Sequence, residues 1–165
     1  MALSACFDAV SAEDARVLIL GTLPGAESLR RQQYYAYKHN SFWRIMGELI
    51  GAAPELAYED RLSLLKARGV ALWDVCAFAE RVGSLDSNIR SPAPNDFPSF
   101  FKLHPRIELI CFNGQPAEKL FRRNAPVGAP AIRQLVLPST SPAHARMPFE
   151  EKLARWRAAL GTFID

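Results

Sequence analysis

The sequence predicts an α/β fold in three layers, α/β/α, in which helices cover both faces of a central four-stranded, mainly parallel sheet. Four short aliphatic or β-branched runs alternate along the chain with segments of helical periodicity, which is the pattern of βα units. Two loops rich in small and hydroxyl residues each follow directly after one of these runs. The length of 165 residues and a composition of 49% hydrophobic and 22% charged residues suit one globular domain. We therefore expect residues 1–165 to form a single domain.

The four runs have the length and the flanking residues of buried parallel strands. Their apolar side chains are largely consecutive, as expected for strands that are covered on both faces. The predicted strands occupy residues 16–20, 70–73, 107–112 and 133–137.

The clearest predicted helix covers residues 41–50, because its apolar side chains recur every three or four positions and share one face. Asn40 or Ser41 is placed to cap its first turn, and Gly51 to end it. Residues 81–96 are rich in Ser, Asn, Asp and Pro and are expected to form a long surface loop. Further helices are expected at residues 57–68, from Phe97 to a break at Pro105, at residues 116–123, and after Pro148.

The composition disfavours several classes of protein. No apolar stretch approaches the roughly 20 residues of a membrane span, and the first ten residues lack the basic start of an export signal. Cys6, Cys76 and Cys111 stand apart in apolar surroundings, which favours buried thiols over a metal site. We therefore expect a monomeric, cytoplasmic protein with no metal, no cofactor and no membrane partner.

Positive charge is concentrated in the C-terminal part of the chain. Up to Ser99 there are 10 Lys and Arg against 12 Asp and Glu, whereas from Phe100 onward there are 10 against 5. A basic region of this kind is able to follow a polyanion, but it is equally typical of a solvated helix face. The basic residues concerned are Arg122, Arg123, Arg133, Arg146, Lys152, Arg155 and Arg157.

The two small-residue loops, residues 21–28 and 137–144, are the strongest functional signal in the chain. Each follows a predicted strand, and ligands bind at the carboxyl ends of the strands in α/β sheets. Glycine and other small residues leave room for a phosphate or a flat ring to approach the main chain. We interpret the two loops as the lips of a cleft that processes nucleic acid.

The segment from Gly21 to Trp43 resembles the first conserved block of the uracil-DNA glycosylase superfamily. The matching features are Gly-x-x-Pro-Gly-x-x-Ser from Gly21, the aromatic pair Tyr34–Tyr35, and Asn-x-Phe-Trp from Asn40. Residues 137–143 resemble the second block, the loop that these enzymes push into DNA. The branch most similar to this chain is that of the hypoxanthine (deoxyinosine) DNA glycosylases, which is related to the mismatch-specific uracil/thymine glycosylases.

The chain departs from the superfamily at two polar positions. The mismatch-specific enzymes carry a catalytic Asn where this chain has Leu23, and the uracil glycosylases carry a His where it has Ser139. The hypoxanthine branch shares this loss and relies on the Asn of Asn-x-Phe-Trp. The resemblance therefore implies that Asn40 is the catalytic residue. Asp74 and Asp86 are the acidic residues nearest the inferred cleft and are the alternatives for positioning the water.

The resemblance also assigns the remaining site residues. The expected base pocket consists of Gly21, Thr22, Leu23, Tyr34, Tyr35 and Asn113. The expected contacts to DNA are Pro24, Gly25, Ser28, Ser139, Thr140, Ser141, Pro142, Ala143, His144 and Arg146. Tyr35 is the better candidate for stacking on the base, and Ala143 or His144 for entering the space that the base vacates.

The resemblance implies a monofunctional DNA glycosylase that turns a deaminated base out of double-stranded DNA and hydrolyses its N-glycosidic bond. Hypoxanthine is the expected base. Two alternatives stay open: a glycosylase that prefers uracil in G:U mismatches, and a lesion-binding module that kept the cleft and lost the chemistry. No lysine stands at a signature position, so strand cutting through a Schiff base is not expected.

Overall fold

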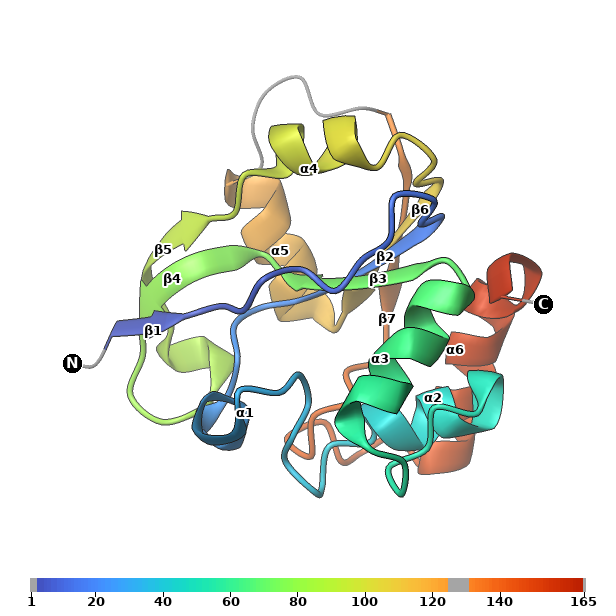
Figure 1. Cartoon of the computed structure of the whole chain (residues 1–165). Helices are drawn as coiled ribbons and strands as arrows, with labels where there is room; N and C mark the ends of the chain where they lie inside the picture. The colour runs from blue at the N-terminus through green and yellow to red at the C-terminus, as the bar shows by residue number, and fades with distance from the viewer. Residues whose placement is uncertain (1–2, 125–130, 165) are drawn as a thin grey trace.

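The computed structural model describes residues 3–124 and 131–164 (Figure 1). Within these residues, seven strands form two sheets, with helices around them. The strands are β1 (Leu3–Ala5), β2 (Val17–Gly21), β3 (Val70–Asp74), β4 (Cys76–Glu80), β5 (Arg90–Pro94), β6 (Leu109–Asn113) and β7 (Arg133–Leu137). The helices are α1 (Ala26–Arg31), α2 (Phe42–Ile50), α3 (Tyr58–Ala67), α4 (Phe97–Leu103), α5 (Gln115–Asn124) and α6 (Phe149–Ile164), with a 3₁₀ turn at Asp86–Asn88.

The main sheet has four parallel strands in the order β3-β2-β6-β7, which confirms the predicted architecture. Each predicted strand is present, with ends that shift by at most two residues. Strand β2 lies inside the sheet and all five of its residues are buried. Consecutive side chains of a strand point to opposite faces, so a fully buried strand requires a covering layer on each side.

Helices cover both faces of this sheet, as predicted. Ile19 faces a core that contains Phe42 from α2 and Trp156 from α6. Its neighbour Leu20 faces a second core on the opposite side of the sheet, where Phe97 from α4 is fully buried. In Figure 1, α2, α3 and α6 lie together on one side of the sheet, and α4 and α5 lie on the other.

The prediction of a long surface loop at residues 81–96 is wrong. The segment contains a 3₁₀ turn and the strand β5, which pairs with β4 in a second, antiparallel sheet of order β1-β4-β5. Pro92 and Pro94 led to the prediction of a loop in this segment, because proline lacks the N–H that a central strand needs. An edge strand tolerates proline, and β5 is at the edge.

The predicted ends of the helices are confirmed by the backbone. Gly51 ends α2 with φ of 78°, and Gly69 follows α3 with φ of 73°; both values favour glycine. Cys76 and Cys111 are buried as expected, whereas Cys6 is half-exposed and contacts Asn95. Among the described residues, no helix is both long enough and apolar enough to cross a bilayer.

The four parallel strands end at one edge of the sheet and bring distant residues together there. Gly21 at the end of β2 lies opposite Asp74 at the end of β3, and Asn113 of β6 lies opposite Leu137 of β7. The chain runs from β2 to β3 on one side and returns to β6 on the other, so the order reverses between β2 and β6. A sheet of this type opens a crevice at that point.

Candidate active site

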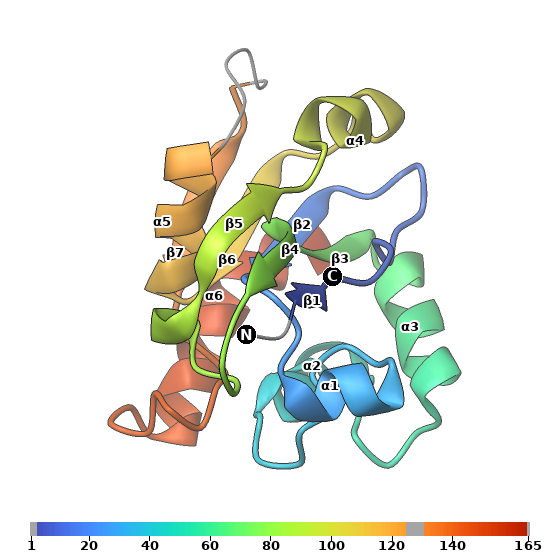
Figure 2. The same ribbon diagram turned by 90° about the vertical axis from the view of Figure 1, so that its left-hand side faces the viewer.

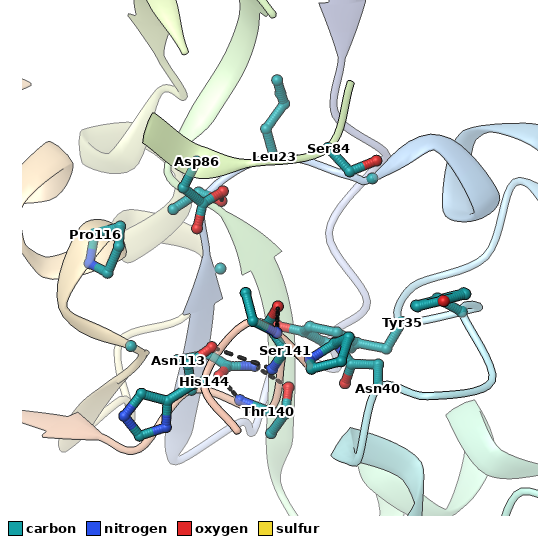
Figure 3. Close-up of a pocket in the computed structure, with 18 of the residues that line it drawn as sticks. Leu23, Tyr35, Asn40, Ser84, Asp86, Asn113, Pro116, Thr140, Ser141 and His144 are labelled. Atoms are coloured by element: carbon teal, nitrogen blue, oxygen red, sulfur yellow. Dashed lines mark hydrogen bonds between the residues drawn. The ribbon is translucent and has the colours of Figure 1, made fainter. Parts of the chain in front are cut away.

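A cleft of about 1260 Å³ opens at this edge of the main sheet (Figure 3). It is lined by the last residues of the four strands, by both loops expected to form its lips, and by Asn40. Figure 3 shows Leu23, Ser84 and Asp86 on one side of the cleft and Asn113, Thr140 and Ser141 on the other. Its volume is larger than most small-molecule pockets, so it has room for a nucleotide and its neighbours.

Among the described glycines that line the cleft, Gly21 has the least room for a side chain. A Cβ atom built on Gly21 would lie 2.7 Å from Asp74 Oδ1 and 3.0 Å from the Tyr35 hydroxyl oxygen. Only a residue without a side chain therefore allows these two polar groups to approach the same stretch of backbone.

We expect Gly21→Ala to lower the rate of base release about 10-fold, because the added methyl group must push the Asp74 carboxyl aside. Single-turnover kinetics on a lesion duplex measure the effect. Gly161→Ala is the control, since a Cβ there meets no atom within 4 Å and Gly161 does not line the cleft. Equal rates for Gly21→Ala and wild type would show that the close approach has no role.

Asp74 is the most perturbed carboxyl group of the cleft. It is 4% exposed, and no described residue donates a hydrogen bond to its buried Oδ2. Burial and, to a smaller extent, the charge of Asp86 together raise the pKa of Asp74 to about 7, although Arg81 acts to lower it. Other titratable groups that its charge affects are Cys6, Cys76, Tyr34 and Tyr35. Up to neutral pH, Asp74 is therefore a neutral acid with one donor and one acceptor.

Asn40 lies on the cleft wall immediately before α2. Its Oδ1 accepts a hydrogen bond from the N–H of Phe42, the first residue of α2, at 2.9 Å; this satisfies one free N–H of the first turn from the position before the N-cap residue Ser41. No described residue accepts a hydrogen bond from its Nδ2 group, and Asn40 lines the cleft. The capping and catalytic roles considered for Asn40 are thus compatible, because they use different atoms of one amide.

The two tyrosines of the first block lie in different environments. Tyr34 is 4% exposed, and its hydroxyl donates to the Asp8 carbonyl at 3.1 Å, so most of its ring belongs to the core. Tyr35 is half-buried and stacks on Phe42, with ring centroids 4.1 Å apart and planes 9° apart. Phe42 thus covers one face of the Tyr35 ring, so a base is able to stack only on the part of the ring that Phe42 leaves uncovered.

The second loop is fixed to the sheet through Thr140. Asn113 Nδ2 donates to Thr140 Oγ1 at 2.9 Å, and Asn113 Oδ1 accepts from the Thr140 N–H at 2.9 Å. Ser41 N–H donates to the Thr140 carbonyl at 3.0 Å, which joins the loop to the start of α2. These contacts bury Thr140, so it holds the loop in position at the cleft wall.

Helix α6 holds both ends of the same loop. Trp156 Nε1 donates to the Pro138 carbonyl at 2.9 Å, and the buried Lys152 donates to the His144 carbonyl at 2.7 Å. Between these ends, Pro142, Ala143 and His144 are exposed at the cleft rim. The loop is therefore presented in one conformation before any DNA binds.

Leu23 and Ser28 line the cleft as expected, although their side chains also pack within the protein, and Arg146 lies outside the lining. The Leu23 side chain points away from the cleft and packs with Cys76 and Ala79 (Figure 3). Ser28 is buried, and its hydroxyl accepts from the Ala36 N–H at 3.1 Å, so it holds the first loop in shape. Arg146 is exposed but does not line the cleft.

The β4–β5 connection, residues 81–89, forms a wall that the sequence did not indicate. Thr22 Oγ1 donates to Asp86 Oδ1 at 2.6 Å, and the Ala26 N–H donates to Ser84 Oγ at 2.9 Å. The buried Arg81 donates to the Pro24 carbonyl and lies 3.6 Å from Asp86 Oδ1. The surface-loop composition of this segment gives no hint that it is fastened to a loop about 60 residues earlier.

Comparison with known proteins places this cleft in a family. The family model described as the uracil DNA glycosylase superfamily matches residues 7–161. The chain belongs to the uracil DNA glycosylase superfamily.

Two relatives of this superfamily member come from species of Methanosarcina. A protein of Methanosarcina acetivorans named hypoxanthine DNA glycosylase is 40% identical over 156 residues, which are 92% of this chain and 94% of that protein. One of the same name from Methanosarcina barkeri is 38% identical over 110 residues, 66% of this chain and 70% of that protein.

A solved structure supports the superfamily fold directly. A solution NMR structure from Methanosarcina acetivorans, assigned provisionally as a uracil DNA glycosylase, matches with a TM-score of 0.81 and 38% identity. The match covers 98% of this chain and 99% of the other. The chain therefore has the fold of that structure over nearly its whole length.

Proposed function

We propose that this protein is a monofunctional DNA glycosylase that removes hypoxanthine from double-stranded DNA and leaves an abasic site, acting as a monomer. The observation that carries the proposal is the cleft itself, in which Asn40 and the neutral carboxyl of Asp74 line one space of nucleotide size. The names of the Methanosarcina relatives agree with it.

Hydrolysis of an N-glycosidic bond develops positive charge on the sugar and negative charge on the departing base. Donors aimed at the base before reaction lower the barrier, because they need no reorganisation in the transition state. The uncommitted Nδ2 group of Asn40 is such a donor. Among the described residues that line the cleft there is no lysine, so water and not an amine takes the place of the base.

Recognition of the base is assigned to Asp74. Hypoxanthine differs from adenine by a lactam edge, on which O6 accepts and N1–H donates a hydrogen bond. A neutral carboxyl group complements that edge with its own O–H and C=O.

Uracil is the second candidate substrate, since its N3–H and O4 present the same lactam edge. The cleft volume of about 1260 Å³ accommodates a purine, and so size does not exclude either base. Hypoxanthine is preferred because both variant positions, Leu23 and Ser139, lack the polar side chains of the uracil-removing branches.

The test is base release from labelled duplexes that carry hypoxanthine or uracil, followed by alkaline cleavage of abasic sites. We expect strand cleavage only after alkali and faster release of hypoxanthine than of uracil. Cleavage without alkali would contradict the monofunctional assignment. Binding of the hypoxanthine duplex with no release of either base would identify a lesion-binding module instead.

A further inference from the structure

The β4–β5 connection exposes two apolar side chains beside the cleft. Val82 is 61% and Leu85 is 56% exposed, and Leu85 also lines the cleft. Figure 2 shows this connection at the same end of the molecule as α1 and the loop before α6. The proposed base release does not use these two side chains, and their exposed apolar surface is suited to contact with a binding partner.

Leu85 is exposed although its neighbours are fixed. Ser84 accepts the hydrogen bond from Ala26 N–H, and Asp86 accepts the one from Thr22. Arg81, at the base of the tip, is buried and bound to the Pro24 carbonyl. A side chain between two anchored residues is held in place, so its exposure is a property of the fold and not of a loose loop.

The chemistry of the tip fits the stacked bases of DNA. Residues 82–85 carry no charge, and the charge of Asp86 is compensated by Thr22 and Arg81. Proteins that bend or open a duplex insert apolar wedges such as leucine between base steps. Among the described large apolar side chains that line the cleft, Leu85 is the most exposed, ahead of Tyr37 and Val136.

We propose that Leu85 is a second insertion residue, which enters the base stack beside the extruded nucleotide from the side opposite to the second loop. The inference rests on the proposed function. Together the two rims hold the duplex open, with Leu85 replacing stacking that the extruded base loses.

The experiment compares Leu85→Ala, Leu85→Met and wild type on hypoxanthine in a paired duplex and in an unpaired bubble with the same flanks. Leu103→Ala is the matched control, because Leu103 is 68% exposed at the end of α4 and does not line the cleft. We expect Leu85→Ala to slow release from the paired duplex about 10-fold and from the bubble by less than about 2-fold. Leu85→Met and Leu103→Ala keep wild-type rates on both.

Two results overturn the inference: a Leu85→Ala rate on the paired duplex equal to wild type, or equal losses on paired and unpaired substrates. Equal losses would make Leu85 a wall of the base pocket. Failure of the proposed function is distinguishable, because wild type itself would then release no hypoxanthine from either substrate.

Discussion

Replacing Asn40 by alanine is expected to lower the single-turnover rate of hypoxanthine release roughly 100- to 1000-fold, the range for removing one aligned donor. The Nδ2 group is free to face the departing base because Oδ1 already accepts from the Phe42 N–H. Loss of this hydrogen bond is also expected to lower the free energy of unfolding by about 1 kcal/mol. Alkaline cleavage of labelled duplex measures the first effect and urea denaturation the second.

Asn40→Asp separates the two roles. Aspartate keeps an oxygen for the Phe42 N–H but has no N–H to donate, so this variant is expected to be as stable as wild type and as slow as Asn40→Ala. An Asn40→Asp enzyme with wild-type rates would show that the amide donor is dispensable. Asp74 would then be the next candidate for catalysis.

The second large effect concerns Asp74. Replacement by leucine is expected to slow hypoxanthine release about 100-fold, because the lactam edge of the base then meets an apolar group. Replacement by asparagine keeps one donor and one acceptor, and we expect it to retain most of the activity at pH 6. Wild-type activity should fall as the pH rises through about 7, where Asp74 ionises, while the Asp74→Asn profile stays flat over that range.

Stability provides an independent check on Asp74. Its pKa is about 7 in the folded chain and about 4 when unfolded, so between these values only the unfolded state releases the proton. Stability is therefore lost as the pH rises from about 4 to 7, by on the order of 4 kcal/mol from this group. Asp74→Asn should be more stable than wild type at pH 8 and about equal at pH 4. Identical pH dependence of unfolding for both proteins would contradict the assignment.

The main sheet and its helices were predictable because their signals are local. The spacing of apolar residues is enough to indicate burial in two places. One is the run that forms β2, and the other is the helical face that contains Phe42 and Ile45. The cleft was predictable in outline for the same reason, since loops that follow parallel strands meet at one edge. Asn40 and Tyr35 were identified as candidate site residues only through the resemblance to a family.

Contacts between segments far apart in sequence could be known only from the three-dimensional structure. Strand β5 exists through pairing with β4, and the fastening of Thr22 to Asp86 spans 64 positions. The environment of Asp74 arises from burial among β2, β3 and the β4–β5 connection, and no local pattern encodes a pKa of about 7. Local sequence patterns indicate which residues are buried and where the strands end. Desolvation and hydrogen-bond pairing depend on which surfaces meet in space, and so the chemical state of the site was fixed by the fold.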